Sequence, residues 1–131
     1  MSQIVKRILV VDDDPNVARA LADCVGSMSA LYAVETAVDG THALEVVRSR
    51  RPDLVLLDIN LPGRDGLTTL KDIRKLDRTI PVIIVTGRAE SLVMTEALNN
   101  GAFAFVPKPF DLKYVENLAA LALQPQMVAA R

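Results

Sequence analysis

One stretch decides how this chain folds: Asp53-Leu54-Val55-Leu56-Leu57-Asp58-Ile59-Asn60-Leu61-Pro62-Gly63. Its four consecutive apolar residues end abruptly at the Asp58 carboxylate, and turn residues follow. An apolar run of this kind, closed by turn signals, is typical of a buried strand in a parallel sheet. The side chain after such a strand emerges at the strand's carboxyl end, where open parallel sheets bind ligands. We therefore expect Asp58 to lie at a functional site.

Strand patterns and helical patterns alternate along the chain. Four further strands are predicted, at Arg7–Val11, Tyr32–Ala37, Pro81–Val85 and Phe103–Val106. Apolar residues at helical spacing follow each strand, and in the last helix those expected to face inward are Leu112, Val115, Leu118 and Ala119. This alternation predicts an α/β fold, a doubly wound parallel sheet of five strands with helices on both faces. A charged residue, Glu35, favours an edge position for its strand.

The composition fits one domain with a single core. Half of the 131 residues are hydrophobic, and the net charge of -1 gives no sign of direct nucleic-acid binding. The one cysteine, Cys24, cannot form an internal disulfide, which fits a reducing cytoplasm. No apolar run approaches the ~20 residues that span a membrane. We expect a cytoplasmic domain over residues 1–123, without membrane contact, and a tail or the start of a linker over residues 124–131.

Polar residues stand at the ends of four predicted strands. Asp12 and Asp13 follow the first, Asp58 the third and Lys108 the fifth, while Thr86 directly follows the fourth. Because the carboxyl ends of parallel strands share one edge, these side chains are expected to gather there. Clustered carboxylates repel one another unless a cation joins them, and magnesium binds through carboxylates, phosphate oxygens and water. A carboxylate beside such an ion can accept a phosphoryl group, with the lysine and the hydroxyl contacting its oxygens.

Four motifs together resemble the receiver domain of bacterial two-component response regulators. They are Ile-Leu-Val-Val-Asp-Asp-Asp-Pro at 8–15, Leu-Leu-Asp-Ile-Asn-Leu-Pro-Gly-Arg-Asp-Gly at 56–66, Ile-Val-Thr-Gly at 84–87 and Pro-Lys-Pro-Phe at 107–110. The resemblance runs from Lys6 to Leu123. It implies a flavodoxin-like (CheY-like) sheet with the strand order 2-1-3-4-5.

The resemblance implies a phosphoryl acceptor and its metal ligands. Asp58 matches the phosphoacceptor, which takes its phosphoryl group from the phosphohistidine of a histidine kinase. Asp13 and Asp58 match the carboxylates that bind Mg2+ directly, Asp12 matches a neighbour acting mainly through water, and the backbone carbonyl of Asn60 matches the remaining ligand. The family's chemistry is its own phosphorylation and dephosphorylation, so we expect a signalling domain and not an enzyme with a separate substrate.

The resemblance also implies a switch. Thr86 matches the switch hydroxyl, Lys108 the phosphate-binding lysine and Phe105 the switch aromatic position, where many members have tyrosine. The Lys108–Pro109 bond is expected to be cis. Pro107 removes a backbone donor at the end of the strand. The form Pro-Lys-Pro-Phe resembles receivers that feed AAA+ transcription activators.

The implied partners are a histidine kinase or phosphotransfer protein upstream, and an output domain, a separate target or a second copy downstream. A homodimer would form through the fourth helix, fifth strand and fifth helix. The sequence itself names neither the kinase nor the output.

Other functions fit the sequence less well. Asp12-Asp13-Asp14 after a strand also fits the Asp-x-Asp of haloacid-dehalogenase-type phosphatases, with Asp12 as nucleophile and Asp14 as acid/base. That alternative lacks a further acidic motif and a cap segment. A dinucleotide-binding domain is excluded because no Gly-x-Gly-x-x-Gly follows the first strand. A receiver that signals without phosphorylation finds no support, since every chemical position is intact.

Overall fold

The structure, a computed structural model, describes residues 4–61, 65–87 and 91–124, and within them five strands alternate with five helices as predicted. The strands are β1 (Lys6–Val11), β2 (Tyr32–Ala37), β3 (Leu54–Leu57), β4 (Val82–Thr86) and β5 (Ala104–Pro107). The helices are α1 (Pro15–Gly26), α2 (Gly40–Arg50), α3 (Gly66–Leu76), α4 (Ser91–Asn99) and α5 (Leu112–Leu123). None of the described helices is long and apolar enough to cross a membrane.

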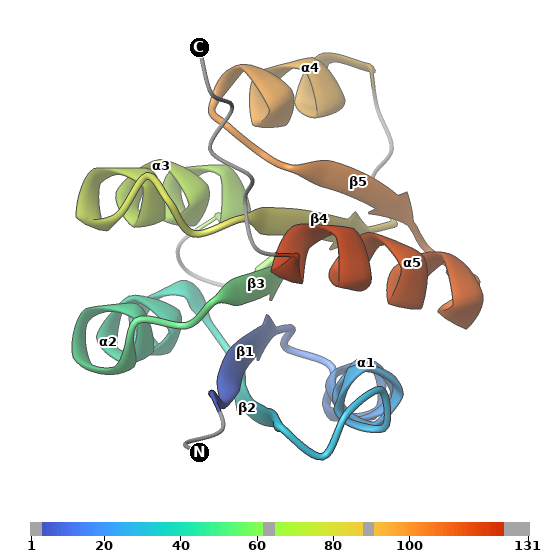
Figure 1. Cartoon of the computed structure of the whole chain (residues 1–131). Coiled ribbons are helices and arrows are strands. Elements are labelled where there is room, and N and C mark those ends of the chain that lie inside the picture. The colour runs from blue at the N-terminus through green and yellow to red at the C-terminus, as the bar shows by residue number, and fades with distance from the viewer. Residues whose placement is uncertain (1–3, 62–64, 88–90, 125–131) are drawn as a thin grey trace, which may run out of the picture.

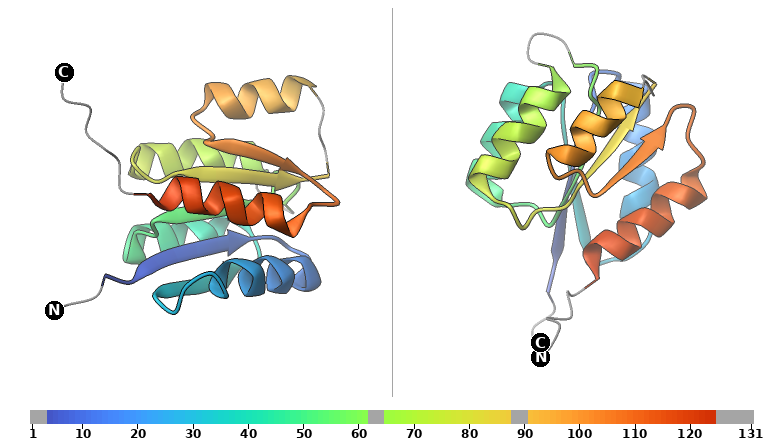
Figure 2. Two further views of the ribbon diagram at one scale, coloured as in Figure 1. Left: turned by 45° about the vertical axis from the view of Figure 1, so that its right-hand side comes forward. Right: turned by 90° about the horizontal axis from the view of Figure 1, so that it is seen from above.

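The strands form one parallel sheet in the order β2-β1-β3-β4-β5, and their arrowheads point to the same side of the molecule (Figure 2). The predicted strand order is therefore confirmed, and β2 lies at an edge as Glu35 indicated. Both β4 and β5 begin and end one residue later than predicted, because Thr86 pairs with Pro107 at the carboxyl end. The turn expected at Pro62-Gly63 lies outside the described residues.

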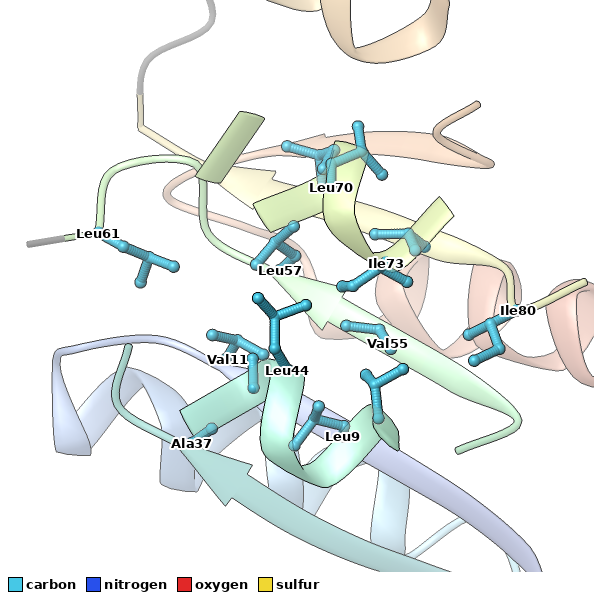
Figure 3. Packing of buried hydrophobic residues seen from close by; sticks show 14 of the residues in the cluster. Leu9, Val11, Ala37, Leu44, Val55, Leu57, Leu61, Leu70, Ile73 and Ile80 are labelled. Carbon is cyan, nitrogen blue, oxygen red and sulfur yellow. The ribbon is translucent and has the colours of Figure 1, made fainter. Parts of the chain in front are cut away.

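The sheet is covered on both faces (Figure 1). Buried residues of α2, α3 and α4 join one apolar cluster, and those of α1 and α5 join a second cluster on the opposite face. Strand β3 is apolar throughout because both of its faces are buried. Val55 and Leu57 lie in the first cluster, and Leu54 and Leu56 lie in the second. Figure 3 shows Leu57 between side chains of both neighbouring helices, α2 and α3.

Aspartates begin four of the helices. The side chains of Asp14, Asp39, Asp65 and Asp111 each accept a hydrogen bond from a backbone amide in the first turn of the helix that follows. All four of these helices follow directly on loops at the carboxyl edge of the sheet. The caps therefore fix the loops in which the functional residues lie.

One expectation about the core is wrong. Leu112 was predicted to face inward, but 46% of it is exposed. The buried stripe of α5 runs through Val115, Ala119 and Leu123, and Leu112 lies at its margin in the first turn. Cys24 is buried on α1.

Candidate functional site

Backbone hydrogen bonds continue the sheet one residue beyond three of its strands. The Asp12 amide donates to the Ala37 carbonyl at 3.1 Å, and the Asp58 amide donates to the Val11 carbonyl at 2.9 Å. On the other side, the Lys108 amide donates to the Thr86 carbonyl at 2.9 Å. Residues from five separate parts of the chain are thereby held at one edge of the sheet.

Lys108 joins two carboxylates at this edge. Its Nζ lies 2.8 Å from Asp12 Oδ2 and 3.0 Å from Asp58 Oδ2. Asp12 and Asp58 are buried, at 1% and 4% exposed, and the lysine side chain remains 22% exposed. Such charge-assisted contacts are strong where water is excluded, so the lysine fixes the separation of the two carboxylates.

The second oxygen of each carboxylate is held by the backbone. The Asp14 amide donates to Asp12 Oδ1 and the Asn60 amide donates to Asp58 Oδ1, both at 2.9 Å. The sequence indicated a role for the Asn60 carbonyl but missed this amide, although Asp-x-Asn at a strand end is a known turn-forming pattern. The role predicted for the Asn60 carbonyl stays a prediction.

A third carboxylate completes an acidic cluster. Oxygens of Asp12, Asp13 and Asp58 all lie within 4.8 Å of one another, and Asp13 is exposed. Three carboxylates with one ammonium leave two negative charges at the site when all are ionised. A hard dication that prefers oxygen ligands balances that charge, so the donor set fits Mg2+. The solvent-facing position of Asp13 also leaves the ion its water ligands.

Burial and mutual contact shift the pKa values of Asp12 and Lys108. Burial raises the pKa of Asp12, because its hydrogen bonds with Lys108 and the Asp14 amide only partly compensate for lost hydration. Burial by itself would lower the pKa of Lys108, but hydrogen bonds to Asp12 and Asp58 and their negative charges outweigh it and raise that pKa. The lysine therefore stays positively charged at neutral pH.

Thr86 and Phe105 lie on one face of the sheet. Thr86 is fully buried at the end of β4, and Phe105 pairs with Ile84, two residues before it. Alternation along the strands puts both side chains toward the α2–α3–α4 face, where Phe105 packs partly buried against the core. The prediction that the Thr86 hydroxyl reaches a phosphoryl oxygen on Asp58 stays a prediction.

The region around Lys108 has the expected backbone. The Lys108–Pro109 peptide bond is cis, as the resemblance implied. Pro107 is the last residue of β5 and is exposed.

Gly66 was not singled out by the sequence, yet it lies against the Asp58 loop. A Cβ on Gly66 would lie 2.3 Å from Ile59 Cα and 2.6 Å from the Asp58 carbonyl oxygen. Its amide donates to the Ile59 carbonyl at 2.8 Å. Only a glycine lets the start of α3 approach the Asp58 loop this closely.

Asp14 is the N-cap of α1. Its Oδ1 accepts a hydrogen bond from the Asn16 amide at 2.9 Å. The described acidic cluster comprises Asp12, Asp13 and Asp58. The phosphatase alternative needed Asp14 as the acid/base beside Asp12, and this arrangement does not favour it.

Known proteins share both the sequence and the fold. The regulatory protein AtoC of Escherichia coli (strain K12) is 42% identical over 124 residues, which are 93% of this chain and 26% of AtoC. The DNA-binding response regulator MtrA of Mycolicibacterium smegmatis is 39% identical over 115 residues, 86% of this chain and 48% of MtrA. The chain thus spans half or less of the length of these relatives.

Two solved structures are similar along their full length. A CheY-like response regulator receiver domain protein from Methanospirillum hungatei superposes with a TM-score of 0.86 at 30% identity, covering 91% of this chain and 94% of that one. The receiver domain of NtrX from Brucella abortus has a TM-score of 0.84 at 33% identity, covering 91% of this chain and 99% of the other.

A family match agrees with these relatives. Receiver domains are phosphoacceptor signalling domains that generally use Mg2+ and that interact with kinases and output domains. Residues 8–120 match the response regulator receiver domain. With this match, the strand order and the bacterial relatives, the chain belongs to the response regulator receiver domain family and functions in two-component signalling.

Proposed function

We propose that Asp58 accepts a phosphoryl group from the phosphohistidine of a histidine kinase or phosphotransfer protein. One observation carries the proposal: Lys108 bridges Asp12 and Asp58, with Asp13 in the same cluster. The bridge supports the predicted convergence of an acceptor, a phosphate-binding cation and a metal-binding pair.

The reaction is a transfer between two nucleophiles. An Asp58 carboxylate oxygen forms a P–O bond as the P–N bond to the kinase imidazole breaks, and the imidazole nitrogen keeps the electron pair. Asp12, Asp13, Asp58 and the Asn60 carbonyl would hold Mg2+, which when bound offsets charge on the phosphoryl oxygens. The site would act mainly by positioning the reacting groups and by stabilising their charge, because phosphoryl transfer needs little covalent chemistry from the protein.

The chain's own groups orient the acceptor. The Asn60 amide fixes Asp58 Oδ1, and the Lys108 ammonium lies at Oδ2, where it would move onto the incoming phosphoryl oxygens. Burial of Asp58 limits access of water to the product.

The proposed output is a change on the face next to β5. Thr86 would donate its hydroxyl to the phosphoryl group, and the space that it leaves would be filled by Phe105. Exposed apolar side chains around that face support a binding role: Leu92 and Leu98 on α4, and Tyr114 and Leu121 on α5. A homodimer through α4, β5 and α5, a cytoplasmic target, or an output domain after a linker at residues 124–131 would use this surface.

Intact-mass measurement tests the proposal. With acetyl phosphate and Mg2+, the wild-type chain should gain one phosphoryl group, and Asp58→Asn should gain none. Asp23→Asn, a change of an exposed carboxylate on α1, is the matched control and should be phosphorylated normally. A phosphoryl group that persists in Asp58→Asn but disappears in Asp12→Asn would refute the proposal in favour of the phosphatase chemistry.

A further inference from the structure

A cationic cluster lies at the edge of the sheet opposite Asp58. Lys71, Arg74, Lys75 and Arg78 follow one another at the spacing i, i+3, i+4 and i+7, along one side of α3 and the loop after it. They line a cavity of about 600 Å3 together with Asn99, Asn100 and Gly101. The residues described as lining this cavity include no carboxylate. Positive charge here is therefore concentrated on a chain whose net charge is -1.

Most of these cations are unpaired. Within the described part of the chain, Lys71, Lys75 and Arg78 take part in none of the ion pairs, which use Arg50, Arg51 and Lys108. The neighbouring Asp77 is already engaged, because it accepts from Thr79 and lies 3.6 Å from Arg51 Nη1. Asp77 is therefore a partial counter-charge, shared by Arg51 and Arg74, and it does not balance the four cations.

Arg74 gives the clearest sign of a missing ligand. Its Nη1 donates to the Arg78 carbonyl at 3.1 Å, but its Nε and Nη2 are buried without any hydrogen-bond partner. A buried donor without an acceptor is unfavourable, and more so when it is charged. Burial also lowers the pKa of Arg74, against the opposing charge of Asp77. Nε and Nη2 form the fork that grips a carboxylate or phosphate through two parallel bonds.

The helix dipole explains only some of these basic residues. Basic residues near the end of a helix stabilise its dipole, which accounts for Arg74 and Lys75 in the last turn of α3. It does not account for the unpaired guanidinium nitrogens, or for Arg78 in the following loop.

Gly101 and Phe103 shape the space around the guanidinium. A Cβ on Gly101 would lie 3.0 Å from Arg74 Cδ, so the glycine lets the Arg74 side chain lie close against the backbone here. An adjoining cavity of about 930 Å3 shares Arg74 and Arg78 and is also lined by Lys6 and Phe103. One carboxylate, Asp53, lines it too, and its Oδ2 accepts a hydrogen bond from the Arg7 amide at 2.8 Å. The Phe103 ring is 44% exposed and offers an apolar surface beside the cations.

We propose that these adjoining cavities bind a soluble organic phosphate. Its phosphoryl oxygens would lie among Arg74, Arg78 and the two lysines, with Arg74 turning its free fork toward them, and its aromatic or apolar part would lie over Phe103. Phosphate is favoured over a single carboxylate because four cations meet there and arginine binds phosphate through two bonds. The volumes are in the range of small-molecule sites.

NMR titration with ADP and with inorganic pyrophosphate, both without Mg2+, tests the site. Both ligands should shift amide signals at the end of α3 and in the loop after it. Lys75→Gln with Arg78→Gln should weaken both at least roughly tenfold, the loss expected for charge-assisted contacts. Phe103→Ser should weaken ADP binding and leave pyrophosphate binding unchanged. The control, Arg48→Gln with Lys113→Gln, removes the same charge from exposed positions on α2 and α5 and should bind like wild type.

Three results would overturn the inference. One is an equal loss of ligand affinity in the Lys75→Gln/Arg78→Gln variant and in the control double variant, which would show that binding depends on net charge alone. Another is a set of shifts confined to Asp12, Asp58 and Lys108. The third is co-sedimentation with phosphatidylcholine–phosphatidylglycerol vesicles without binding of either soluble ligand, which would assign the cluster to a lipid headgroup. Because the readout does not involve phosphorylation of Asp58, it is independent of the function proposed above.

Discussion

Lys108 Nζ lies 3.0 Å from Asp58 Oδ2, and it reaches Asp12 as well. The ammonium thus neutralises part of the negative charge on the two carboxylates, which a bound metal ion would also neutralise. Before an ion binds, Lys108 limits the repulsion between two buried carboxylates. The positive charge of Lys108 would oppose the binding of a metal ion to the carboxylates. The same charge would attract a phosphoryl group.

Replacing Lys108 should therefore separate metal binding from phosphoryl transfer. In Lys108→Ala the site loses one positive charge, so Mg2+ should bind more tightly by roughly tenfold, as expected for one nearby charge in a partly solvated site. Phosphorylation by acetyl phosphate should slow by at least roughly tenfold. Calorimetric titration with Mg2+ and intact-mass time courses measure the two effects.

Lys113→Ala is the control for this variant, because Lys113 is an exposed lysine on α5. It should change neither quantity. Weaker Mg2+ binding in Lys108→Ala would contradict the competition between lysine and metal.

Gly66→Ala should distort the loop that carries Asp58. The new Cβ would meet Ile59 Cα at 2.3 Å and the Asp58 carbonyl at 2.6 Å, and backbone atoms cannot yield as a flexible side chain does. We expect a loss of about 1–3 kcal/mol in the free energy of unfolding, together with weaker Mg2+ binding. Urea unfolding and Mg2+ titration measure these.

Gly26→Ala serves as the matched change in α1. There the added Cβ would meet only Val34 Cγ2, at an ordinary 3.5 Å. Alanine also favours the helix, so stability should be unchanged or rise by up to about 1 kcal/mol. If both alanine variants lose the same stability, the close approach of Gly66 is not the cause.

The fold was predictable because its signals are local. β3 is apolar at every position since both faces of the sheet are covered, and Glu35 could mark an edge because a charged residue is tolerated only where solvent reaches the strand. The helix starts were readable from Asp14 and Asp111, whose side chains cap the next turn. Leu112 was misjudged because periodicity alone does not say how far the helix packs on the sheet.

The site was predictable in composition but not in detail. The parallel sheet implies that Asp12, Asp58 and Lys108 share one edge, and they do. The amide of Asn60 on Asp58 Oδ1 and the closeness of Gly66 depend on loop backbone, which residue types do not specify. The cluster around Arg74 was missed because basic residues at the end of a helix have an ordinary explanation.

Thr86 should be needed for the response to phosphorylation but not for phosphorylation itself. Thr86→Ala removes the hydroxyl and leaves Asp58 and Lys108 in place, whereas Thr86→Ser keeps the hydroxyl. With beryllofluoride and Mg2+, NMR shifts of Phe105 and its neighbours in β5 should appear in wild type and Thr86→Ser and be largely lost in Thr86→Ala. Full shifts in the alanine variant would show that the hydroxyl carries no signal.

The loop after α3 should show a defined pH dependence. Hydrogen bonds from the Thr79 hydroxyl and amide lower the pKa of Asp77 below its usual 3.8, with a smaller contribution from the charge of Arg51. The folded state therefore binds this proton less tightly than the unfolded chain. Its stabilisation is complete above pH 3.8 and is lost as the pH falls through the lowered pKa of the folded state.

Thr79→Ala removes the hydroxyl bond and tests this sign. It should cost about 1 kcal/mol in the free energy of unfolding at neutral pH, and the difference from wild type should shrink as Asp77 becomes protonated. Urea unfolding over a series of acidic buffers measures it. Thr36→Ala, at an exposed position of the edge strand β2, is the control, and its effect should not vary with pH in that range. A difference for Thr79→Ala that stays constant into strong acid would mean that the hydroxyl acts through packing and not through the Asp77 charge.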